Sequence, residues 1–378
     1  MANILVKIYA PQEVNHSSYI HTGLFEMQAL GLIDVKIYLK LKTYLGTIRI
    51  EGSRVYKEHK RPQPKTSYYK IIDKKKQKTL TIAIDLYDAA NQFSAYALSH
   101  CDVVFKRNYE TKYMNQLPKS QAQKIKRFGL SFPLNSKNYT HKNRMFFGLI
   151  INTMHLNLKF DKNMFSRIKK SINVNLNEWR YIQKSRALSN FQHYAKSRSN
   201  TVLFQTRCFP HQNDTDVKEI HEQRYTIIKC LKNNFRDNFN GGFVPSKIAN
   251  ELYNDALTNL PTEQKLYIKA VKNAGIVIYT RGLSNSPAWK LPEYLSQGKV
   301  IIAENLTAEL PVPLEHGKDV LFFNNLEELV SNVNLVLNNM KLREELSKNA
   351  RKYYENYINP VERMKYVINN SFDYQIIK

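Results

Sequence analysis

The feature that most constrains the fold is a series of short apolar runs that alternate with segments of helical periodicity. Clear examples are TLTIAIDLYD at 79–88, GIVIY at 275–279 and KVIIA at 299–303. Nearly continuous apolar runs of this length are expected of parallel strands that are covered on both faces. Strands that alternate with helices in turn indicate a parallel α/β sheet. The pattern therefore predicts an α/β protein.

The alternation occurs twice, which predicts two Rossmann-like domains in tandem. The first spans 1–155 and includes a basic insertion at 57–78, and the second spans 201–356. Between them, 156–200 combines apolar residues at helical spacing with a basic outer face, so we expect a helical connector there. A last helix is expected in 357–378. Because open α/β sheets bind ligands beyond the carboxyl ends of their strands, two such domains facing each other enclose a binding cleft.

The net charge is the most informative compositional property. Lysine and arginine number 57 against 32 aspartates and glutamates, which gives a net charge of +25. Such a surface attracts polyanions, namely nucleic acid, anionic lipid head groups or phosphorylated substrates. A general bias toward lysine and asparagine, with mostly solvated charges, contributes to the excess.

Several protein classes are disfavoured by composition. A hydrophobic content of 43% argues against wholesale disorder. No apolar run reaches the length of a membrane-spanning helix, and the first residues, MANILVKIYAP, indicate a strand rather than a signal peptide. The three cysteines form no CxxC pair and the ten histidines show no metal-ligand spacing, so we expect a cytoplasmic protein without a metal site. The motif DTD at 214–216 is interpreted as a solvated loop or a helix cap.

Many polar and charged residues lie in the connection between GIVIY and KVIIA, which reads TRGLSNSPAWKLPEYLSQG. Pro292 cannot lie inside a helix, so the helix begins just before it and ends at Gly298, a residue suited to a left-handed cap. Arg281 and Lys290 add positive charge to the free N–H groups of that first turn, which predicts a site for phosphate groups. Glu293, one turn further on, is placed to accept hydrogen bonds from a sugar or ribose diol.

The second domain resembles the donor-binding domain of GT-B glycosyltransferases of the group 1 type. The run WKLPEYLSQGKVIIAE is similar to their helix and strand in which a glutamate contacts the ribose or sugar of the donor, and that position is Glu293. Asn285 stands eight positions earlier, where many members have a second glutamate, and Ser286 follows it in the predicted anion-binding loop. LFQTRCF is similar to the first strand of the donor domain, after which a basic residue, here Arg207, touches the diphosphate.

The resemblance implies a GT-B fold, in which two Rossmann-like domains face each other across a cleft. It implies a glycosyltransferase that moves a sugar from a nucleotide-sugar donor to a glycan or lipid-linked acceptor, in the biosynthesis of surface polysaccharide, lipopolysaccharide or a similar glycan. The first domain would hold the acceptor, the second the donor, and the last helix would cross back to the first domain. We expect no metal and no cofactor besides the nucleotide sugar as co-substrate, because Arg207, Arg281 and Lys290 can stabilise the leaving diphosphate.

Four charged residues follow strands of the first domain. Asp85 and Asp88 end the run TLTIAIDLYD and are the candidates for the catalytic base of an inverting reaction. Asp88 also suits the cap of the helix that follows. Lys106 and Arg107 end another strand and are candidates for binding an anionic acceptor.

The basic segments 57–78 and 159–198 have a predicted partner and two open alternatives. Lysine and arginine beside aromatic residues suit an anionic membrane, so we expect a cytoplasmic protein that associates peripherally with the inner face of the membrane. A catalytically inactive GT-B-like binding protein remains open because of Asn285. A nucleic-acid-binding protein remains open because of the charge, although no zinc finger, RNP-type or GXXG-loop signature is present.

Overall fold

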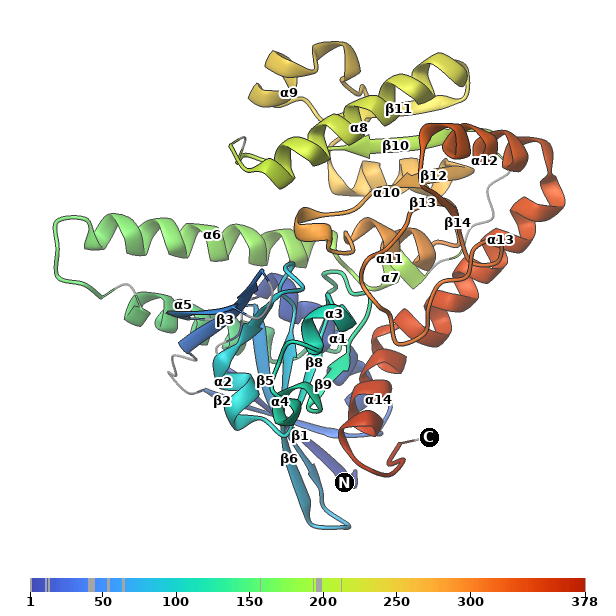
Figure 1. Ribbon diagram of the computed structural model, residues 1–378. Helices are drawn as coiled ribbons and strands as arrows, with labels where there is room; N and C mark the ends of the chain where they lie inside the picture. The colour runs from blue at the N-terminus through green and yellow to red at the C-terminus, as the bar shows by residue number, and fades with distance from the viewer. Residues whose placement is uncertain are drawn as a thin grey trace. The chain divides into compact units, whose positions relative to one another are not determined.

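The computed structural model describes residues 2–377 except 11, 13, 40–44, 53–54, 63–64, 157, 193, 195–198 and 212. Contacts divide the chain into two compact units. Unit 1 comprises Met1–Ser189, Ala308–Pro311 and Asn359–Lys378, and unit 2 comprises Asn190–Thr307 and Val312–Ile358. Each unit has its own α/β sheet of mostly parallel strands (Figure 1). The predicted fold class, with two Rossmann-like α/β units, is confirmed.

Unit 1 is built on a six-stranded sheet with the order β2-β1-β5-β6-β8-β9. Strand β5 pairs antiparallel with both of its neighbours, and the other five strands run in one direction. The strands are β1 (Ile4–Ala10), β2 (Asp34–Leu39), β5 (Thr66–Asp73), β6 (Lys78–Asp85), β8 (Val103–Lys106) and β9 (Ile125–Arg127).

The central strand β5 corrects the prediction of a basic insertion over 57–78. Residues 66–73 lie between β1 and β6, with Tyr68, Tyr69 and Ile71 buried. The lysines that made the segment look like an insertion gather in the exposed turn 74–77, which closes the hairpin with β6. The side chains of 57–62 lie outside the described residues. A small second sheet has the order β4-β3-β7 and contains β3 (Leu45–Glu51), β4 (Val55–Pro62) and β7 (Gln92–Ser94).

Helices cover the main sheet of unit 1. Helix α1 packs closely on α14, and a Cβ on Gly23 would collide with the carbonyl oxygen of Pro360, so glycine permits the close approach. Helices α5 and α6 form a hairpin in which the rings of Phe146 and Trp179 lie 5.0 Å apart. The helices are α1 (Val14–Ala29), α2 (Ala95–His100), α3 (Thr111–Met114), α4 (Lys119–Ala122), α5 (Lys142–Leu156), α6 (Met164–Ser185), α14 (Pro360–Ser371) and, at the unit boundary, α7 (Ser189–Gln192).

Unit 2 has an all-parallel sheet with the order β11-β10-β12-β13-β14. Its strands are β10 (Val202–Thr206), β11 (Phe239–Phe243), β12 (Ile276–Tyr279), β13 (Val300–Glu304) and β14 (Leu321–Phe323). The helices are α8 (Thr215–Asn234), α9 (Lys247–Leu252), η1 (Asn254–Ala256), α10 (Gln264–Asn273), η2 (Leu283–Asn285), α11 (Lys290–Ser296), α12 (Leu326–Asn338), α13 (Met340–Tyr353) and η3 (Tyr354–Ile358). The strand side chains and the inner faces of α8 and α12 share one apolar core.

The contacts also place the segments that the sequence assigned as a connector and a crossing helix. Helix α6, from the predicted connector 156–200, belongs to unit 1 and packs on α5. Helix α14, from the predicted last segment 357–378, belongs to unit 1 as well. The domain limits at 155, 200 and 356 stay predictions.

Candidate functional site

The loops that follow β10 and β12 lie at the same edge of the unit 2 sheet, because the two strands pair in parallel. Arg207 is the first residue after β10, and Arg281 belongs to the connection after β12. In α/β sheets this carboxyl edge is where ligands bind. The site is therefore built from the loop after β10, the connection at 280–289 and the helices that each loop leads into.

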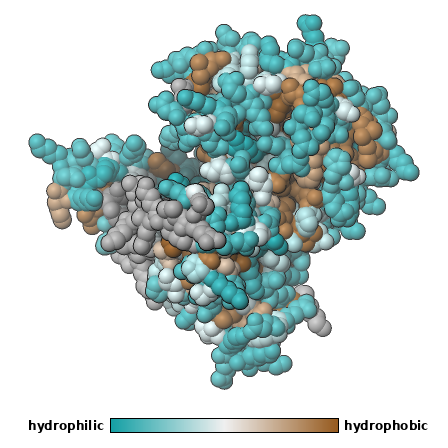
Figure 2. Space-filling model, viewed as in Figure 1, coloured by the Kyte–Doolittle hydropathy of each residue, from teal (hydrophilic) through white to brown (hydrophobic). Residues whose placement is uncertain are grey.

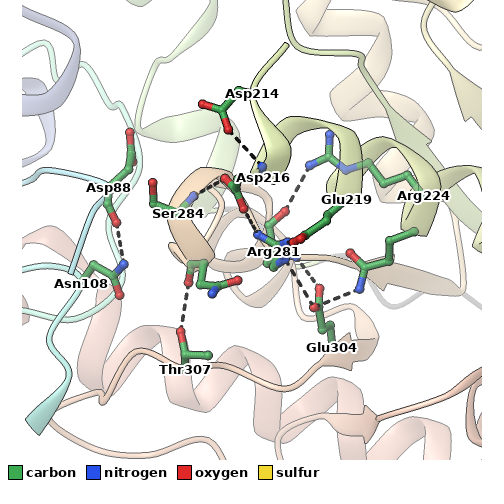
Figure 3. Close-up of polar contacts among 12 residues, drawn as sticks. Asp88, Asn108, Asp214, Asp216, Glu219, Arg224, Arg281, Ser284, Glu304 and Thr307 are labelled. Carbon is green, nitrogen blue, oxygen red and sulfur yellow. Dashed lines mark hydrogen bonds and ion pairs between the residues drawn. The ribbon is translucent and has the colours of Figure 1, made fainter. Parts of the chain in front are cut away.

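The connection after β12 has an unusual backbone conformation. Ser284 and Asn285 have φ angles of 54° and 57°, in the left-handed region that residues other than glycine rarely adopt. The N–H of Ser284 donates to Asp216 at 2.7 Å, and the hydroxyl of Thr307 donates to the carbonyl oxygen of Asn285 at 3.2 Å (Figure 3). Such conformations cost free energy, persist where surroundings hold them, and cluster at ligand sites.

Arg281 is surrounded by carboxylates. Its guanidinium contacts Asp216 at 2.5 Å and Glu219 at 3.4 Å, and its backbone N–H donates to Glu304 at 2.7 Å (Figure 3). Gln223 donates to the same Glu304 at 3.0 Å. The charge of Arg281 is thus compensated by neighbouring side chains. Its predicted contact with a donor stays a prediction and would require the loss of one of these ion pairs.

Lys290 is tied to the neighbouring strand. It is the first residue of α11, and its amine donates a hydrogen bond to the backbone carbonyl of Gln205 in β10. Desolvation lowers the pKa of Lys290 to about 7, although the carboxylate of Glu293 opposes the shift. The positive charges of Arg224 and Arg207 add to the lowering. The amine therefore sits in a place where an arriving anion would favour its protonated form.

Arg224 is a candidate functional residue that the sequence analysis did not select. It is buried on α8 and donates to the carbonyl oxygens of Arg207 at 2.9 Å and Arg281 at 3.1 Å, so one guanidinium bridges the two loops. Its Nε has no hydrogen-bond partner among the described residues. Desolvation lowers the pKa of Arg224 to about 10, and the charge of Arg207 contributes.

The position of Arg224 along its helix could have identified it as a candidate from the sequence. Helical spacing places it in the stripe that α8 buries, together with Ile220, Ile227, Ile228 and Leu231. A charged residue in such a stripe is costly unless it is paired or has a function. The buried position of Arg224 therefore excludes a surface ion pair and marks it as a candidate functional residue.

Helix α11 starts and stops as the sequence predicted. It begins at Lys290, contains Pro292 in its first turn, and is followed by Gly298 with a φ of 59°. One N–H expected to be free at this end, that of Ala288, donates to the hydroxyl of Tyr279 at 2.8 Å. The cationic side chains, rather than the short helix, therefore provide most of the positive potential.

The other predicted donor residues lie around the same edge of the sheet. Asn285 is exposed, whereas Ser286 and Glu293 are buried. The N–H of Gly282 donates to the carbonyl of Ser286 at 2.8 Å and closes the loop. The structure thus brings all six predicted donor residues into unit 2 around β10, β12 and α11, and their contacts with a donor stay predictions.

In unit 1, the four predicted residues pair with one another at the ends of β6 and β8. Asp85 and Lys106 lie 3.5 Å apart and are 1% and 0% exposed. Asp88 contacts Arg107 and Lys65, each at 2.8 Å, and keeps 28% exposure. The expectation that Asp88 caps the next helix is wrong, because the side chain that caps α2 belongs to another residue, Ser94 at its N-cap.

The two carboxylates of this cluster differ electrostatically. Desolvation raises the pKa of Asp85 and lowers the pKa of Lys106, and their mutual attraction offsets only part of each shift. Desolvation would also raise the pKa of Asp88, but Arg107 and Lys65 together hold it well below its usual range. Asp88 is therefore ionised at neutral pH, and it is the one carboxylate of the pair that reaches solvent.

The DTD motif has a structural explanation. The side chain of Asp214 caps α8 by accepting from the N–H of Asp216 at 3.0 Å, and Asp216 pairs with Arg281 (Figure 3). The prediction of a helix cap is confirmed. Within the described ranges, no three His, Cys, Asp or Glu side chains group in a way that would hold a metal ion.

The sequence of this region resembles a known protein family. Residues 221–369 match the family model described as glycosyl transferase-like. The match covers about two fifths of the chain and most of unit 2, including Arg224, Lys290 and Glu293. The predicted resemblance to glycosyltransferases is confirmed over these residues.

Several solved structures resemble this chain distantly. HepE from Anabaena, in complex with UDP-glucose, is 11% identical with a TM-score of 0.39 over 73% of this chain, and the chain spans 65% of its length. TarM from S. aureus, in complex with fondaparinux, alpha-GlcNAc-glycerol and UDP, is 11% identical with a TM-score of 0.37, over 96% of this chain and 99% of TarM. The C-terminal domain of LpcC from Francisella tularensis is 10% identical with a TM-score of 0.31, over 43% and 87%. No curated protein matches the chain in sequence.

Proposed function

We propose that the protein transfers a sugar from a nucleotide-sugar donor to a glycan or lipid-linked acceptor, without a metal ion. The acceptor belongs to surface polysaccharide, lipopolysaccharide or similar glycan biosynthesis. The observation that carries the donor assignment is the group of three cations, Arg207, Arg224 and Lys290, at the carboxyl edge of the unit 2 sheet. Cations held together lower one another's affinity for protons, and an anion between them removes that cost.

The donor diphosphate fits this cation group chemically. Transfer breaks the bond from the anomeric carbon to a phosphate oxygen, so negative charge grows on the leaving diphosphate. Preorganised cations in a desolvated site stabilise that charge more in the transition state than in the ground state. Lys290, with a pKa lowered to about 7, gains most from the growing charge. Glu293 is the candidate for gripping the ribose or sugar diol.

Unit 1 supplies the candidate base and the acceptor residues. Asp88 is favoured over Asp85, because Asp85 is buried against Lys106 whereas Asp88 reaches solvent. A strongly depressed pKa makes Asp88 a weak base in this state, so approach of an acceptor would have to loosen its pairs with Lys65 and Arg107. Lys106 and Arg107 are both buried, which leaves Lys65, at 31% exposure, as a solvent-accessible cation beside partly exposed Asp88.

A cytoplasmic location with peripheral attachment to the membrane completes the proposal. The motivation is the net charge of +25, which favours an anionic surface. An acceptor that is lipid-linked is also presented at such a surface.

A thermal-shift panel of nucleoside diphosphates and their sugars tests the donor assignment. A ligand that binds the folded state stabilises it by mass action, so the correct donor raises the melting temperature above its relatives. The matched variants are Lys290→Met, which should lose the shift, and Lys341→Met, an exposed lysine elsewhere in unit 2, which should keep it. If no nucleotide shifts the wild-type protein, the donor site does not exist.

A catalytically inactive binding protein is the second candidate, favoured by Asn285 in place of a second glutamate and by the neutralised Arg281. It predicts nucleotide-sugar binding without turnover. Release of free nucleotide from any nucleotide sugar, with or without an acceptor, excludes this candidate.

A further inference from the structure

The hairpin of α5 and α6 in unit 1 concentrates exposed apolar side chains. Sixteen large hydrophobic residues are exposed in the described part of the chain, and seven of them lie within 147–174. Single exposed apolar residues are normal, whereas a contiguous group marks an interaction surface. Figure 2 shows apolar brown atoms at the left, where Figure 1 places the connection between α5 and α6.

Helix α5 has an apolar stripe that its own fold does not bury. Phe147, Ile151 and Met154 are exposed at spacings of four and three residues, which is one face of a helix. Other residues of α5, Met145 and Leu149, are buried in unit 1. A helix of a water-soluble unit needs only the buried face to be apolar. The exposed stripe therefore has a purpose other than folding.

The end of the hairpin is the most exposed part of this surface. Phe160, in the connection, is 95% exposed, and Phe165, in the first turn of α6, is 79% exposed. Leu158 is exposed beside them. Aromatic side chains carry large apolar areas, so leaving two of them in water is unfavourable unless a partner covers them.

The same hairpin is strongly basic. Residues 142–185 contain nine lysines and arginines and two carboxylates, Asp161 and Glu178. Asp161 is engaged by Arg167 at 2.7 Å, so it does little to offset the other cations. Exposed cations near the end of the hairpin are Lys159, Lys162, Lys169 and Lys170.

We propose that the α5–α6 hairpin inserts into the surface of an anionic membrane, with Phe160 and Phe165 entering the acyl boundary and the lysines contacting lipid phosphates. A basic surface with interspersed aromatic and aliphatic residues binds in this way. No helix among the described residues is long and apolar enough to cross a bilayer, so attachment through this hairpin is peripheral.

Charge and apolarity together select this partner over the alternatives. A second copy of the chain would bring the same excess of positive charge to the interface, which opposes association. A nucleic acid would satisfy the lysines but leave the apolar stripe of α5 in water. The inference deepens the proposed function, because it names the surface at which a lipid-linked acceptor is met.

Co-sedimentation of the full chain with vesicles tests the apolar part. The vesicles contain phosphatidylcholine alone or phosphatidylcholine mixed with phosphatidylglycerol. We expect the wild type to bind the mixed vesicles, and Phe160→Ser with Phe165→Ser to weaken binding by about tenfold or more. The matched control, Leu252→Ser with Leu335→Ser, removes two exposed leucines from unit 2 and should bind as the wild type does.

A second pair of variants tests the charge. Lys169→Gln with Lys170→Gln should weaken binding to the mixed vesicles and reduce its dependence on salt, whereas Lys341→Gln with Lys348→Gln on α13 should not.

Phe160→Trp provides a direct probe of how deeply this side chain enters the membrane. Its emission should shift to shorter wavelength on the mixed vesicles.

Three outcomes would overturn the inference. These are equal vesicle binding by the Phe160 and Phe165 variant and its leucine control, no shift of the tryptophan emission, and a wild-type dimer that the phenylalanine substitutions dissociate. Nucleotide thermal shifts measured on the same variants keep the two proposals apart. Loss of vesicle binding with a normal nucleotide shift concerns the hairpin, whereas the absence of any nucleotide shift concerns the donor site.

Discussion

The side-chain amine of Lys290 donates a hydrogen bond to the backbone carbonyl of Gln205, and so the first residue of α11 is anchored to strand β10. Arg207 follows that strand by one residue, and Arg224 reaches the same loop from α8. Unit 2 therefore collects these cations from three separate stretches of chain. Their proximity has measurable consequences.

The affinity for a nucleotide sugar should fall as pH rises through neutrality. The amine of Lys290 has a pKa of about 7, so it is a cation below this pH and neutral above it. A diphosphate binds the cation better, and the loss of one charged hydrogen bond weakens affinity by about tenfold to a hundredfold. Calorimetric titration of the nucleotide sugar from about pH 6 to about pH 9 checks this loss of affinity, because that interval brackets the pKa of Lys290. Lys290→Met should bind weakly and without this pH dependence; a variant that retains the wild-type profile would show that another group titrates.

Arg224→Met should weaken nucleotide binding by about tenfold or more. The substitution removes hydrogen bonds from a charged group to the carbonyls of Arg207 and Arg281, each of which contributes about 1.5–3 kcal/mol. The loops should then exchange their amide hydrogens faster, which hydrogen-exchange mass spectrometry detects. Arg236→Met, at an exposed position after α8, is the control. Unchanged exchange and affinity in Arg224→Met would mean that the guanidinium does not organise the site.

Substitution with asparagine should have different effects at Asp85 and at Asp88. Asp85→Asn leaves the buried charge of Lys106 without its partner and should lower the free energy of unfolding by about 3 kcal/mol or more. Asp88→Asn also removes the carboxylate that pairs with buried Arg107, but it should lower the free energy of unfolding by less because Asp88 is partly exposed, and it should lower the rate of transfer by about a hundredfold or more if Asp88 is the base. Urea unfolding and a transfer assay measure the two effects. Normal transfer by Asp88→Asn would remove it as the base.

Acid should destabilise unit 1 through His21. This imidazole is buried, is hydrogen-bonded to Gln12 at 2.8 Å and Tyr139 at 3.1 Å, and has its pKa lowered to about 3 by desolvation. Between about pH 6.5 and about pH 3 the unfolded chain binds a proton that the folded chain does not, so stability falls as pH falls, by about 5 kcal/mol in total. Urea unfolding across this range should show a shallower decline for His21→Gln. His155→Gln, at an exposed histidine, should follow the wild type, and parallel declines in all three would exclude His21 as the cause.

Much of the fold could be predicted from the sequence, because helix ends depend on residues that are close together in the chain. Pro292 and Gly298 set the ends of α11, as the sequence indicated. Strand β5 was missed because its apolar residues are interrupted by lysine and followed by a lysine-rich turn, so its burial depends on the strands on either side of it.

The sequence by itself determined the two α/β units, the similarity of residues 221–369 to glycosyl transferases, and the helix that carries Lys290 and Glu293. These follow from periodicity, from proline and glycine chemistry, and from a local motif. Only the tertiary structure decided which charges are compensated. Arg281 meets Asp216, Asp85 meets Lys106, and Arg224 is buried between two loops, because parallel pairing brings together strand ends that are far apart in the chain. Electrostatic pairing depends on distances of a few ångströms, which spacing along the sequence does not encode.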